Sequence, residues 1–380
     1  MDFDFNPDQE QLRDAVRTWV DKGYDFERRK AIVKAGGFSR DAWAEMAGLG
    51  LAGLAVPEAH GGMGFGAVEA MLVCEELGRG IVLEPYAAVA LVAATALAHH
   101  APTQVQEAWL PRVATGEALV LLAHQEREAR HILRHVKTTA RQQGDQWTLD
   151  GAKGVVPIGD QADAFIVPAR VSGAVDDEQG IALFLVERNA PGVSAPGYAM
   201  QDGARAAELT LAQAPATLLV GPGEGCAALE AAVDIGIAAL CAEAVGAMDS
   251  LFAVTVEYLN TRKQFGVAIG TFQALRHRIA DMKMQLELAR SMSYFATLKL
   301  GEAPASRRRA LSQAKVQLGQ SMRFVGQQAI QLHGGIGVTD EYIAGHFFKR
   351  LTCLELTFGD TLHHLGEVSA RMQGTAGVFA

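Results

Sequence analysis

Tyr258-Leu-Asn-Thr-Arg262-Lys-Gln264-Phe265-Gly266 ends one long helical pattern of the sequence, and a second long pattern begins a few residues later. The final glycine can adopt a positive φ angle at a tight corner. Arg262 carries a planar fork of donors suited to phosphate oxygens, and Gln264 can both donate and accept hydrogen bonds. The same residues also fit an ordinary helix C-terminus, where cations complement the helix dipole. The stretch therefore predicts a corner between two helices of a bundle, and it leaves open whether the corner has a ligand.

The region from Gly225 to the C-terminus is predicted to be a bundle of long helices. The run from Cys226 to Thr261 is apolar nearly throughout and would span about 50 Å as one helix. Long helices with short connections are typical of antiparallel packing around a common core. Further helices are expected at 274–300 and 306–332, after Asp340 and from Asp360.

The first 116 residues also carry helical patterns. Asn6-Pro7-Asp8-Gln9 has the residues of a helix start, with Asn6 as the N-cap and Gln9 completing a capping box. Apolar residues at helical spacing follow, and similar patterns recur up to Thr115-Gly116. We therefore expect an α-helical N-terminal domain at 1–116.

Residues 117–224 have a different pattern. Short runs rich in β-branched and apolar residues alternate with turns that contain glycine. Strands at this spacing with no helices between them predict a small β-sandwich or barrel. The strand-like runs lie at 138–140, 147–149, 164–167, 181–186 and 208–211.

Composition narrows the class of protein. The chain has 380 residues, enough for two or three domains, and its formal net charge of −9 disfavours a nucleic-acid-binding protein. The acidic N-terminus does not resemble a signal peptide, and the apolar run at about 87–98 falls short of the ~20 residues that span a bilayer. We therefore expect a cytoplasmic protein with no membrane or nucleic-acid partner. Its cysteines, which lack metal-ligand spacing and are typical of buried thiols in a reducing compartment, are Cys74, Cys226, Cys241 and Cys353.

The corner resembles the Arg-x-Gln-Phe-Gly motif of the acyl-CoA dehydrogenase family, and Phe272-Gln273 follows it as in that family. A second block, Gln331-Leu-His-Gly334-Gly335-Ile-Gly337 before Glu341-Tyr342, matches the family as well. The resemblance covers the whole chain and implies an α+β fold of three domains. These are an N-terminal α-helical domain (1–116), a middle β-sandwich or barrel (117–224) and a C-terminal four-helix bundle (225–380).

The resemblance implies FAD-dependent α,β-dehydrogenation of an acyl-CoA thioester, with electron-transfer flavoprotein as the electron acceptor. It also implies that the C-terminal bundle forms a dimer or tetramer and contacts the FAD of a neighbouring subunit. His333, beside the two glycines, is either a flavin neighbour or a turn residue. The residues implied to contact FAD are Arg262, Gln264, Phe265, Phe272, Gln273, Gln331, Gly334, Gly335, Thr361 and His363.

The general base of the family has no counterpart at its usual place. The family's Tyr-Glu-Gly-Thr block reads Phe358-Gly359-Asp360-Thr361 here, so Gly359 replaces the glutamate. Asp360 is one candidate base, although it also precedes a helix as an N-cap would. Glu243 is a second candidate, because a carboxylate buried in the apolar run of the long helix becomes a stronger base; a structural glutamate is the alternative. The third possibility is a base from another polypeptide.

The middle domain departs from the family where the flavin ring is contacted. The family's Lys-x-Trp-Ile-Thr strand reads Lys153-Gly-Val155-Val156-Pro157, and Pro157 has no N–H to donate. The stretch at 124–131 lacks the small residues of the family's flavin-binding loop. The contacts offered to a neighbour are intact, and the chain resembles the small subunit of pimeloyl-CoA-dehydrogenase-like enzymes. This implies a hetero-oligomer with a large acyl-CoA dehydrogenase subunit, acting on a dicarboxylyl- or other acyl-CoA.

Two other functions compete with this one. A catalytically silent scaffold subunit would supply only FAD contacts to its partner. A flavin monooxygenase or nitroalkane-oxidase-like member of the fold would keep FAD without this glutamate. A DNA-binding relative of the fold is disfavoured by the acidic charge.

Overall fold

The computed structural model describes residues 4–372. Its Cα positions group into two compact units. Unit 1 contains the residues up to Lys30, Ala67–Val82 and the residues from Ile237 on, and unit 2 contains Ala31–Gly66 and Leu83–Gly236. The N-terminal helical region and the long helix that begins at Gly225 are therefore each shared between the two units.

Helix α1 (Pro7–Gly23) begins with the capping box that the sequence predicts. The Asn6 side chain accepts from the Gln9 N–H, and the Gln9 side chain accepts from the Asn6 N–H. Helix α4 (Ala67–Arg79) packs against α1, and an ion pair of 2.6 Å joins Arg17 to the buried Glu76. The other helical segments of this region are α2 (Phe26–Lys34), α3 (Arg40–Gly48), η1 (Leu51–Gly53), η2 (Glu58–His60), the π-helical η3 (Ala87–Ala93), α5 (Ala94–His100) and α6 (Thr103–Ala114).

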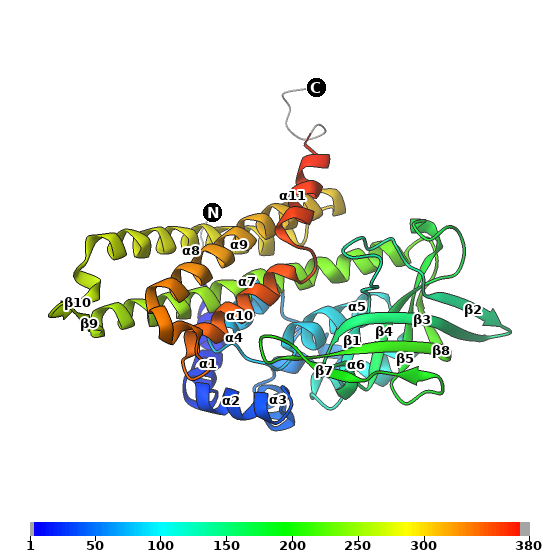
Figure 1. The fold of residues 1–380 in the computed structure, drawn as a ribbon. Helices are drawn as coiled ribbons and strands as arrows, with labels where there is room; N and C mark the ends of the chain where they lie inside the picture. The colour runs from blue at the N-terminus through cyan, green and yellow to red at the C-terminus, as the bar shows by residue number, and fades with distance from the viewer. Residues whose placement is uncertain (1–3, 373–380) are drawn as a thin grey trace. The chain divides into compact units, whose positions relative to one another are not determined.

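The strands of unit 2 form one sheet that closes on itself. They are β1 (Val120–Leu122), β2 (Thr139–Gln143), β3 (Gln146–Pro157), β4 (Ala164–Arg170), β5 (Ile181–Glu187), β6 (Val193–Ser194), β7 (Gly197–Ala199) and β8 (Arg205–Val220). Their order is β1-β4-β2-β3-β8-β5, and β5 pairs back with β4, so the sheet is a barrel. Closure leaves few unpaired edges. The barrel alternative predicted from the sequence is confirmed (Figure 1).

Strands β4 and β5 of the barrel are almost entirely buried. Every residue of β4 is buried, because the run is apolar on both faces until Arg170. The Arg170 guanidinium donates to five backbone carbonyls of the connecting loops, those of Arg134, Val136, Ser172, Val175 and Asp177, at 2.6–3.3 Å. The Arg170 side chain thus satisfies loop carbonyls that have no partner in a regular β-ladder.

The C-terminal region is the predicted helical bundle. Its helices are α7 (Gly225–Thr261), α8 (Gln273–Lys299), α9 (Pro304–His333), α10 (Ile343–Leu356) and α11 (Thr361–Ala370), within a few residues of the expected bounds. Helix α9 lies against α8, α10 and α11 (Figure 1). Pro304 occupies the first turn of α9, where a missing N–H costs nothing.

Helix α7 is the one helix of residues 4–372 that is long and apolar enough to cross a membrane by length and composition. Its most apolar 18-residue window has a hydropathy of 1.7, and 78% of that window is buried inside the protein. The core helix of a globular protein has the same composition. The apolar run at about 87–98 lies in a shorter apolar helical segment, Ala87–His100.

Candidate functional site

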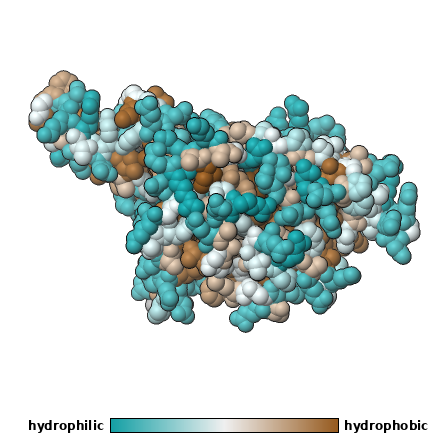
Figure 2. Space-filling model, turned by 90° about the horizontal axis from the view of Figure 1, so that it is seen from below, coloured by the Kyte–Doolittle hydropathy of each residue, from teal (hydrophilic) through white to brown (hydrophobic). Residues whose placement is uncertain are grey.

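A two-stranded hairpin, not foreseen from the sequence, forms the corner between α7 and α8. Strand β9 (Lys263–Gln264) pairs with β10 (Val267–Ala268), and the short η6 (Ile269–Thr271) leads into α8. Phe265 (φ 54°) and Gly266 (φ 82°) both have positive φ, as a tight two-residue hairpin turn requires. The turn leaves Phe265 91% exposed, with its ring 6.1 Å from that of Phe272. Figure 2 shows apolar residues among polar ones at this end of the bundle.

The Arg262 side chain at this corner is free to bind an anion. Its backbone is fixed, because its N–H donates to Tyr258 and its carbonyl accepts from Ile269, both at 2.8 Å. Its guanidinium is exposed and has no hydrogen bond or ion pair within residues 4–372. Among residues 4–372 the Gln264 side-chain amide bonds only to the neighbouring carbonyl of Lys263, at 2.9 Å, and Gln273 is exposed in the first turn of α8. The corner therefore presents a cation and two amides outward.

The segment around Gly334 and Gly335 packs against the end of α7 through three aromatic rings. The His333 ring centroid at the end of α9 lies 4.6 Å from that of Tyr258 and 5.1 Å from that of Tyr342. The His333 Nδ1 lies 2.8 Å from the Ala329 carbonyl and must donate to it, since a carbonyl only accepts. Burial lowers the pKa of His333, so the ring is neutral and its buried Nε2 is an acceptor that has no partner among the described residues. Two motifs far apart in the sequence thus lie together.

The turn after His333 is open on its outer side. Gly334 has a positive φ of 62°, and no atom lies within 4 Å of the place where a Cβ of Gly334 or Gly335 would be. Gln331 is exposed in the last turn of α9. A ligand can therefore approach the backbone of this turn closely.

A third group of predicted residues lies where α10 turns into α11. Asp360 is the N-cap of α11 and accepts from the His363 N–H at 2.7 Å, so the predicted cap is confirmed. The Thr361 hydroxyl donates to Glu355 at 2.6 Å. His363 is half-buried, with its ring 5.1 Å from that of His364. Both Asp360 and Thr361 are thus used in holding the turn.

This turn has no room for a side chain at position 359. Gly359 has a φ of 110°, and a Cβ there would lie 2.6 Å from the His363 ring and 2.8 Å from Nε2 of His364. His364 cannot yield easily, because Nε2 donates to the Phe358 carbonyl at 3.0 Å and Nδ1 lies 3.2 Å from the Ser312 hydroxyl. Burial, and then the nearby charge of Lys315, lower the pKa of His364 to about 3. The His364 ring is therefore neutral, and its hydrogen bonds hold the turn in place.

The Thr361 site and the glycine turn lie against opposite ends of one stretch of α9. Thr361 lies against Gly319, whose Cβ would meet the threonine hydroxyl, whereas the glycine turn follows His333. Fourteen residues of α9 separate these points, which is roughly 21 Å at 1.5 Å per residue. The corner and the glycine turn form one cluster, and Thr361 with His363 forms another.

Glu243, the candidate base on α7, has a cation beside it. Its Oε1 lies 2.6 Å from both Nε and Nη2 of Arg350 on α10. The apolar run of α7 is therefore not the whole environment of Glu243, because α10 places Arg350 beside it. The α7 backbone at Glu243 also contacts Gly78 of α4, where a Cβ would lie 2.1 Å from the Glu243 carbonyl oxygen. A hydrogen-bonded structural glutamate, the alternative left open by the sequence, matches this geometry.

A buried ion pair anchors the middle-domain loop at 124–138. Lys153 Nζ lies 2.7 Å from Glu126 Oε1, which also accepts from the Thr138 N–H and hydroxyl. Burial lowers the pKa of Lys153 to about 8, and burial and then Lys153 lower that of His124 to about 4. Burial is the largest influence on the Glu126 pKa and raises it, but the pKa is lowered overall, because the charge and hydrogen bond of Lys153 act together with the N–H groups of Thr138 and Lys137.

One backbone group in the irregular part of β3 already has a side-chain partner. Register shifts between Lys153 and Val156 make a bulge, in which Val155 has a φ of 53°. The Val155 backbone hydrogen-bonds to the Tyr198 hydroxyl, which donates to Glu208 at 3.0 Å. Burial, and then Glu208, raise the pKa of Tyr198 to about 12. Nothing in the sequence near 155 indicates this arrangement, because both partners come from strands far along the chain.

The surface at the corner and the surface at the bulge of β3 therefore differ in what they offer a ligand. The corner and glycine turn combine a free cation, exposed aromatic rings, open glycines and an unpaired buried acceptor, which suits an anionic dinucleotide. The bulge at Val155 exposes an aliphatic side chain beside the carboxylate of Glu208, and Pro157 adds no donor. The bulge therefore offers few backbone N–H donors to a flavin ring.

Family comparisons agree with this architecture. Three family models match, described as the N-terminal, middle and C-terminal domains of acyl-CoA dehydrogenase, at residues 6–117, 122–213 and 223–373. The acyl-CoA dehydrogenase FadE12 of Mycobacterium tuberculosis is 31% identical over 343 residues, which cover 88% of each chain.

Solved structures match over nearly the whole length. A variant of the Tcur3481-Tcur3483 steroid ACAD is 30% identical, with a TM-score of 0.88 and coverage of 97% of this chain and 99% of the other. The ChsE4-ChsE5 complex from Mycobacterium tuberculosis has a chain 26% identical, with a TM-score of 0.89 and coverage of 99% and 100%.

Proposed function

The chain belongs to the acyl-CoA dehydrogenase family of FAD-dependent oxidoreductases, and from that premise we propose that it is one subunit of a two-subunit enzyme. In this proposal the chain supplies C-terminal contacts to FAD. A partner subunit of the same fold supplies the contacts to the flavin ring and the carboxylate base. The reaction is the α,β-dehydrogenation of an acyl-CoA thioester.

The observation that carries the proposal is the contrast between the two surfaces. Arg262 is exposed and unpaired within residues 4–372, whereas the backbone at Val155 already bonds to Tyr198. Gly359 cannot be a base, Asp360 caps a helix, and Glu243 pairs with Arg350. In a homodimer, each FAD would have the Arg262 corner of one copy but the unsuitable flavin-ring surface of the other. A partner chain with a suitable ring surface and a base would complete the site. The ChsE4-ChsE5 neighbour, named as a complex of two proteins, supports this type of assembly.

The residues present fit FAD at the corner and do not fit it at the bulge. FAD, when bound, supplies the acceptor for the β-hydride. Arg262 would pair with phosphate charge through its guanidinium fork, and Gly334 and Gly335 would let the nucleotide approach the backbone. His333 would keep the turn against Tyr258. The α-proton would pass to a carboxylate of the partner subunit.

The substrate is proposed from resemblance and from the neighbours. The resemblance of the chain to the small subunit of pimeloyl-CoA-dehydrogenase-like enzymes favours a dicarboxylyl-CoA such as pimeloyl-CoA. The match to a steroid ACAD favours a second candidate, the CoA thioester of a bulky polycyclic acid. Electron-transfer flavoprotein is the proposed electron acceptor.

Co-expression tests the assembly. The chain is purified alone and together with a candidate large subunit of the same family, and visible spectra report flavin. We expect a colourless chain and a yellow complex whose flavin is bleached anaerobically by one class of acyl-CoA. Stoichiometric flavin in the chain alone, with bleaching, would contradict the two-subunit proposal.

The same experiment separates the alternatives. A silent scaffold predicts that all catalytic variants of this chain leave bleaching intact once FAD is bound. A flavin monooxygenase predicts flavin that acyl-CoA does not reduce.

A further inference from the structure

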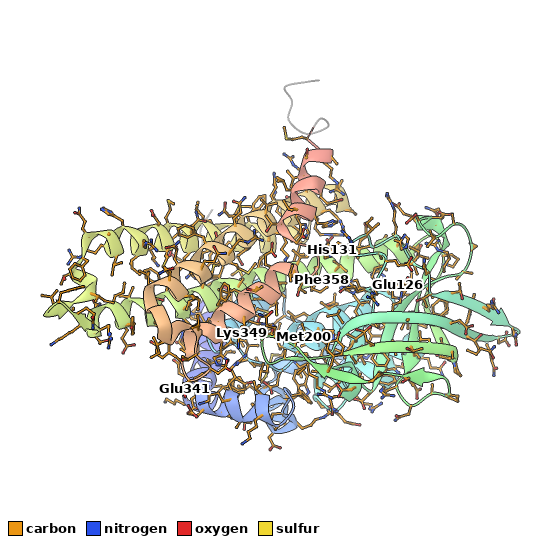
Figure 3. All side chains as sticks on the ribbon, in the orientation of Figure 1. Glu126, His131, Met200, Glu341, Lys349 and Phe358 are labelled. Atoms are coloured by element: carbon orange, nitrogen blue, oxygen red, sulfur yellow. The ribbon has the colours of Figure 1, made fainter. Side chains whose placement is uncertain are left out.

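The segment that follows the glycine turn is tied to α10 by two side chains. Residues 339–342 connect η7 (Gly334–Val338) to that helix. Lys349 Nζ lies 2.8 Å from the Asp340 carboxylate, and Nε2 of His346 lies 3.0 Å from the Asp340 carbonyl oxygen. Figure 3 labels Lys349 on α10 and Glu341 in this segment. Both the carboxylate and the backbone carbonyl of Asp340 are therefore bound by one helix.

The other ring nitrogen of His346 faces a buried cation. Nδ1 lies 3.3 Å from Nη1 of Arg29 on α2, and Arg29 is only 1% exposed. A guanidinium can only donate, so Nδ1 is the acceptor, and a carbonyl can only accept, so Nε2 carries the proton. Arg29 is itself held in place, because its Nε donates to the Ile81 carbonyl at 2.9 Å. The geometry thus requires one neutral tautomer of His346.

The segment that His346 holds carries Tyr342, which packs behind the glycine turn. The Tyr342 ring centroid lies 5.1 Å from that of His333, the last residue of α9 before the turn. Helix α10 also approaches the turn directly, because a Cβ at Gly345 would lie 3.0 Å from the Gly337 carbonyl oxygen. The position of the glycine turn therefore depends on the first turn of α10.

A proton on Nδ1 of His346 would disrupt this arrangement. It would point at the Arg29 guanidinium and place two donors and two positive charges face to face. The charged groups that face the ring are Arg29 from α2, Lys349 from α10 and the Asp340 carboxylate. Burial contributes most to a lowered pKa of His346, Arg29 and Lys349 lower it further, and Asp340 opposes them. The ring is therefore neutral at neutral pH and gains its proton only as the pH falls.

We propose that His346 is a positioning residue for the FAD contacts of this chain. Its neutral ring ties Asp340 to α10 and to Arg29. This tie keeps Tyr342 against His333 and holds the glycine turn in the shape that the dinucleotide contacts. A protonated ring must turn or move away from Arg29, which loosens the tie and weakens FAD binding. The inference rests on the proposed function for the identity of the cofactor.

Hydrogen exchange of the full chain alone tests the positioning. Mass spectrometry follows peptides that cover residues 334–342 at pH 7.5. We expect His346→Leu, which fills space but cannot hydrogen-bond, to exchange roughly tenfold faster in this segment, the effect of losing about one hydrogen bond. His346→Gln keeps a donor and an acceptor, so it should exchange within about twofold of the wild type. Unchanged exchange in His346→Leu overturns the proposal.

Peptides from the rest of the chain separate a local effect from a general loss of stability. His99→Leu, which removes an exposed histidine from α5, is the matched control and should leave residues 334–342 unchanged. Equal acceleration of every peptide in His346→Leu would indicate a general role in folding and would also overturn the proposal.

The FAD affinity of the co-purified complex tests the consequence. Flavin fluorescence measures the Kd at pH 7.5 and pH 5. We expect the wild type to bind FAD at least about threefold more weakly at pH 5, and His346→Gln, whose side chain does not titrate, to change less than about twofold. His346→Leu should bind FAD about tenfold more weakly than the wild type at pH 7.5. The same pH dependence in the wild type and in His346→Gln overturns the proposal.

The two experiments separate this inference from the proposed function. A complex without flavin would contradict the proposed function, and the exchange of the chain alone would still decide whether His346 positions the turn. A yellow complex in which His346→Leu has normal exchange and normal FAD affinity would overturn the inference alone.

Discussion

The corner at Arg262 and the bulge at Val155 differ in which hydrogen-bonding groups they leave available to the expected FAD. Both are irregular stretches with a non-glycine residue at positive φ, Phe265 in one and Val155 in the other. At the corner the backbone satisfies itself and leaves the side chains free, whereas at the bulge Tyr198 takes up a backbone group. A surface offers binding only where its donors have no internal partner.

The turn at Gly359 resembles the bulge rather than the corner. His364, Ser312 and Glu355 satisfy the polar groups around it, and the rings of two histidines occupy the space of a missing side chain. The position at which the family resemblance leads one to expect a base is here part of the packing. The following predictions test whether the contrast between free and satisfied groups holds.

Restoring a glutamate at the turn should have the largest effect. We expect Gly359→Glu to lower the free energy of unfolding by about 3 kcal/mol, from a side chain at φ 110° and from crowding against His363 and His364. Urea unfolding measures this loss. Gly366→Glu on α11, where a Cβ meets nothing within 4 Å, is the control and should be nearly neutral. A stable Gly359→Glu variant that gains dehydrogenation without the partner would show that the turn is open.

Removing the free cation should have the next largest effect, on binding rather than folding. We expect Arg262→Ala to weaken FAD binding by the co-purified complex about 100-fold, because a charge-assisted contact contributes about 2–3 kcal/mol, and to leave unfolding unchanged. Dialysis with flavin fluorescence measures the affinity. Lys263→Ala at the same corner removes the same charge and should have a much smaller effect. Equal losses in both variants would mean that only net charge matters.

The clamp at His364 should make stability depend on pH. Its folded pKa of about 3 lies below the ordinary value of 6.5, so its contribution is complete above pH 6.5 and is lost as pH falls toward 3. At pH 5 we expect a loss of about 2 kcal/mol relative to pH 7. Urea unfolding of His364→Gln should show a shallower slope between pH 6 and 5. Ser312→Ala removes a partner of the ring but no titrating group, so it should lower stability with the slope unchanged.

The smallest effect is expected at Glu243. Because Arg350 neutralises it, we expect Glu243→Gln to lower stability by about 1 kcal/mol and to leave flavin bleaching by acyl-CoA within about twofold. Stopped-flow bleaching of the complex measures the second quantity. Loss of bleaching with FAD retained would instead make Glu243 the base. Arg350→Gln should reproduce the stability loss if the pair is structural.

The fold was largely predictable because its patterns are local. The capping box at Asn6, the long helix ending at Thr261 and the N-cap at Asp360 all depend on residues within one or two turns of each other. The strand positions followed from apolar runs. Whether the strands formed a sandwich or a barrel did not, since closure depends on β5 pairing with β4.

The site was only partly predictable. The sequence placed Arg262 and Gln264 at a corner between two helices and Gly334 and Gly335 after a third helix, and they lie there, although the corner is a hairpin that the sequence did not predict. It did not show that Arg350 lies beside Glu243, because a side chain from a helix about a hundred residues later sets that environment. The engagement of Val155 by Tyr198 was missed for the same reason.

The sequence by itself determined the helical and β regions and the ends of the helices, because each depends on residues that are close together in the chain. Only the tertiary structure decided which polar groups remain free, because hydrogen-bond partners such as Tyr198, Arg350 and His364 arrive from distant segments. A donor or acceptor becomes a binding group when folding leaves it without a partner, and that depends on three-dimensional packing.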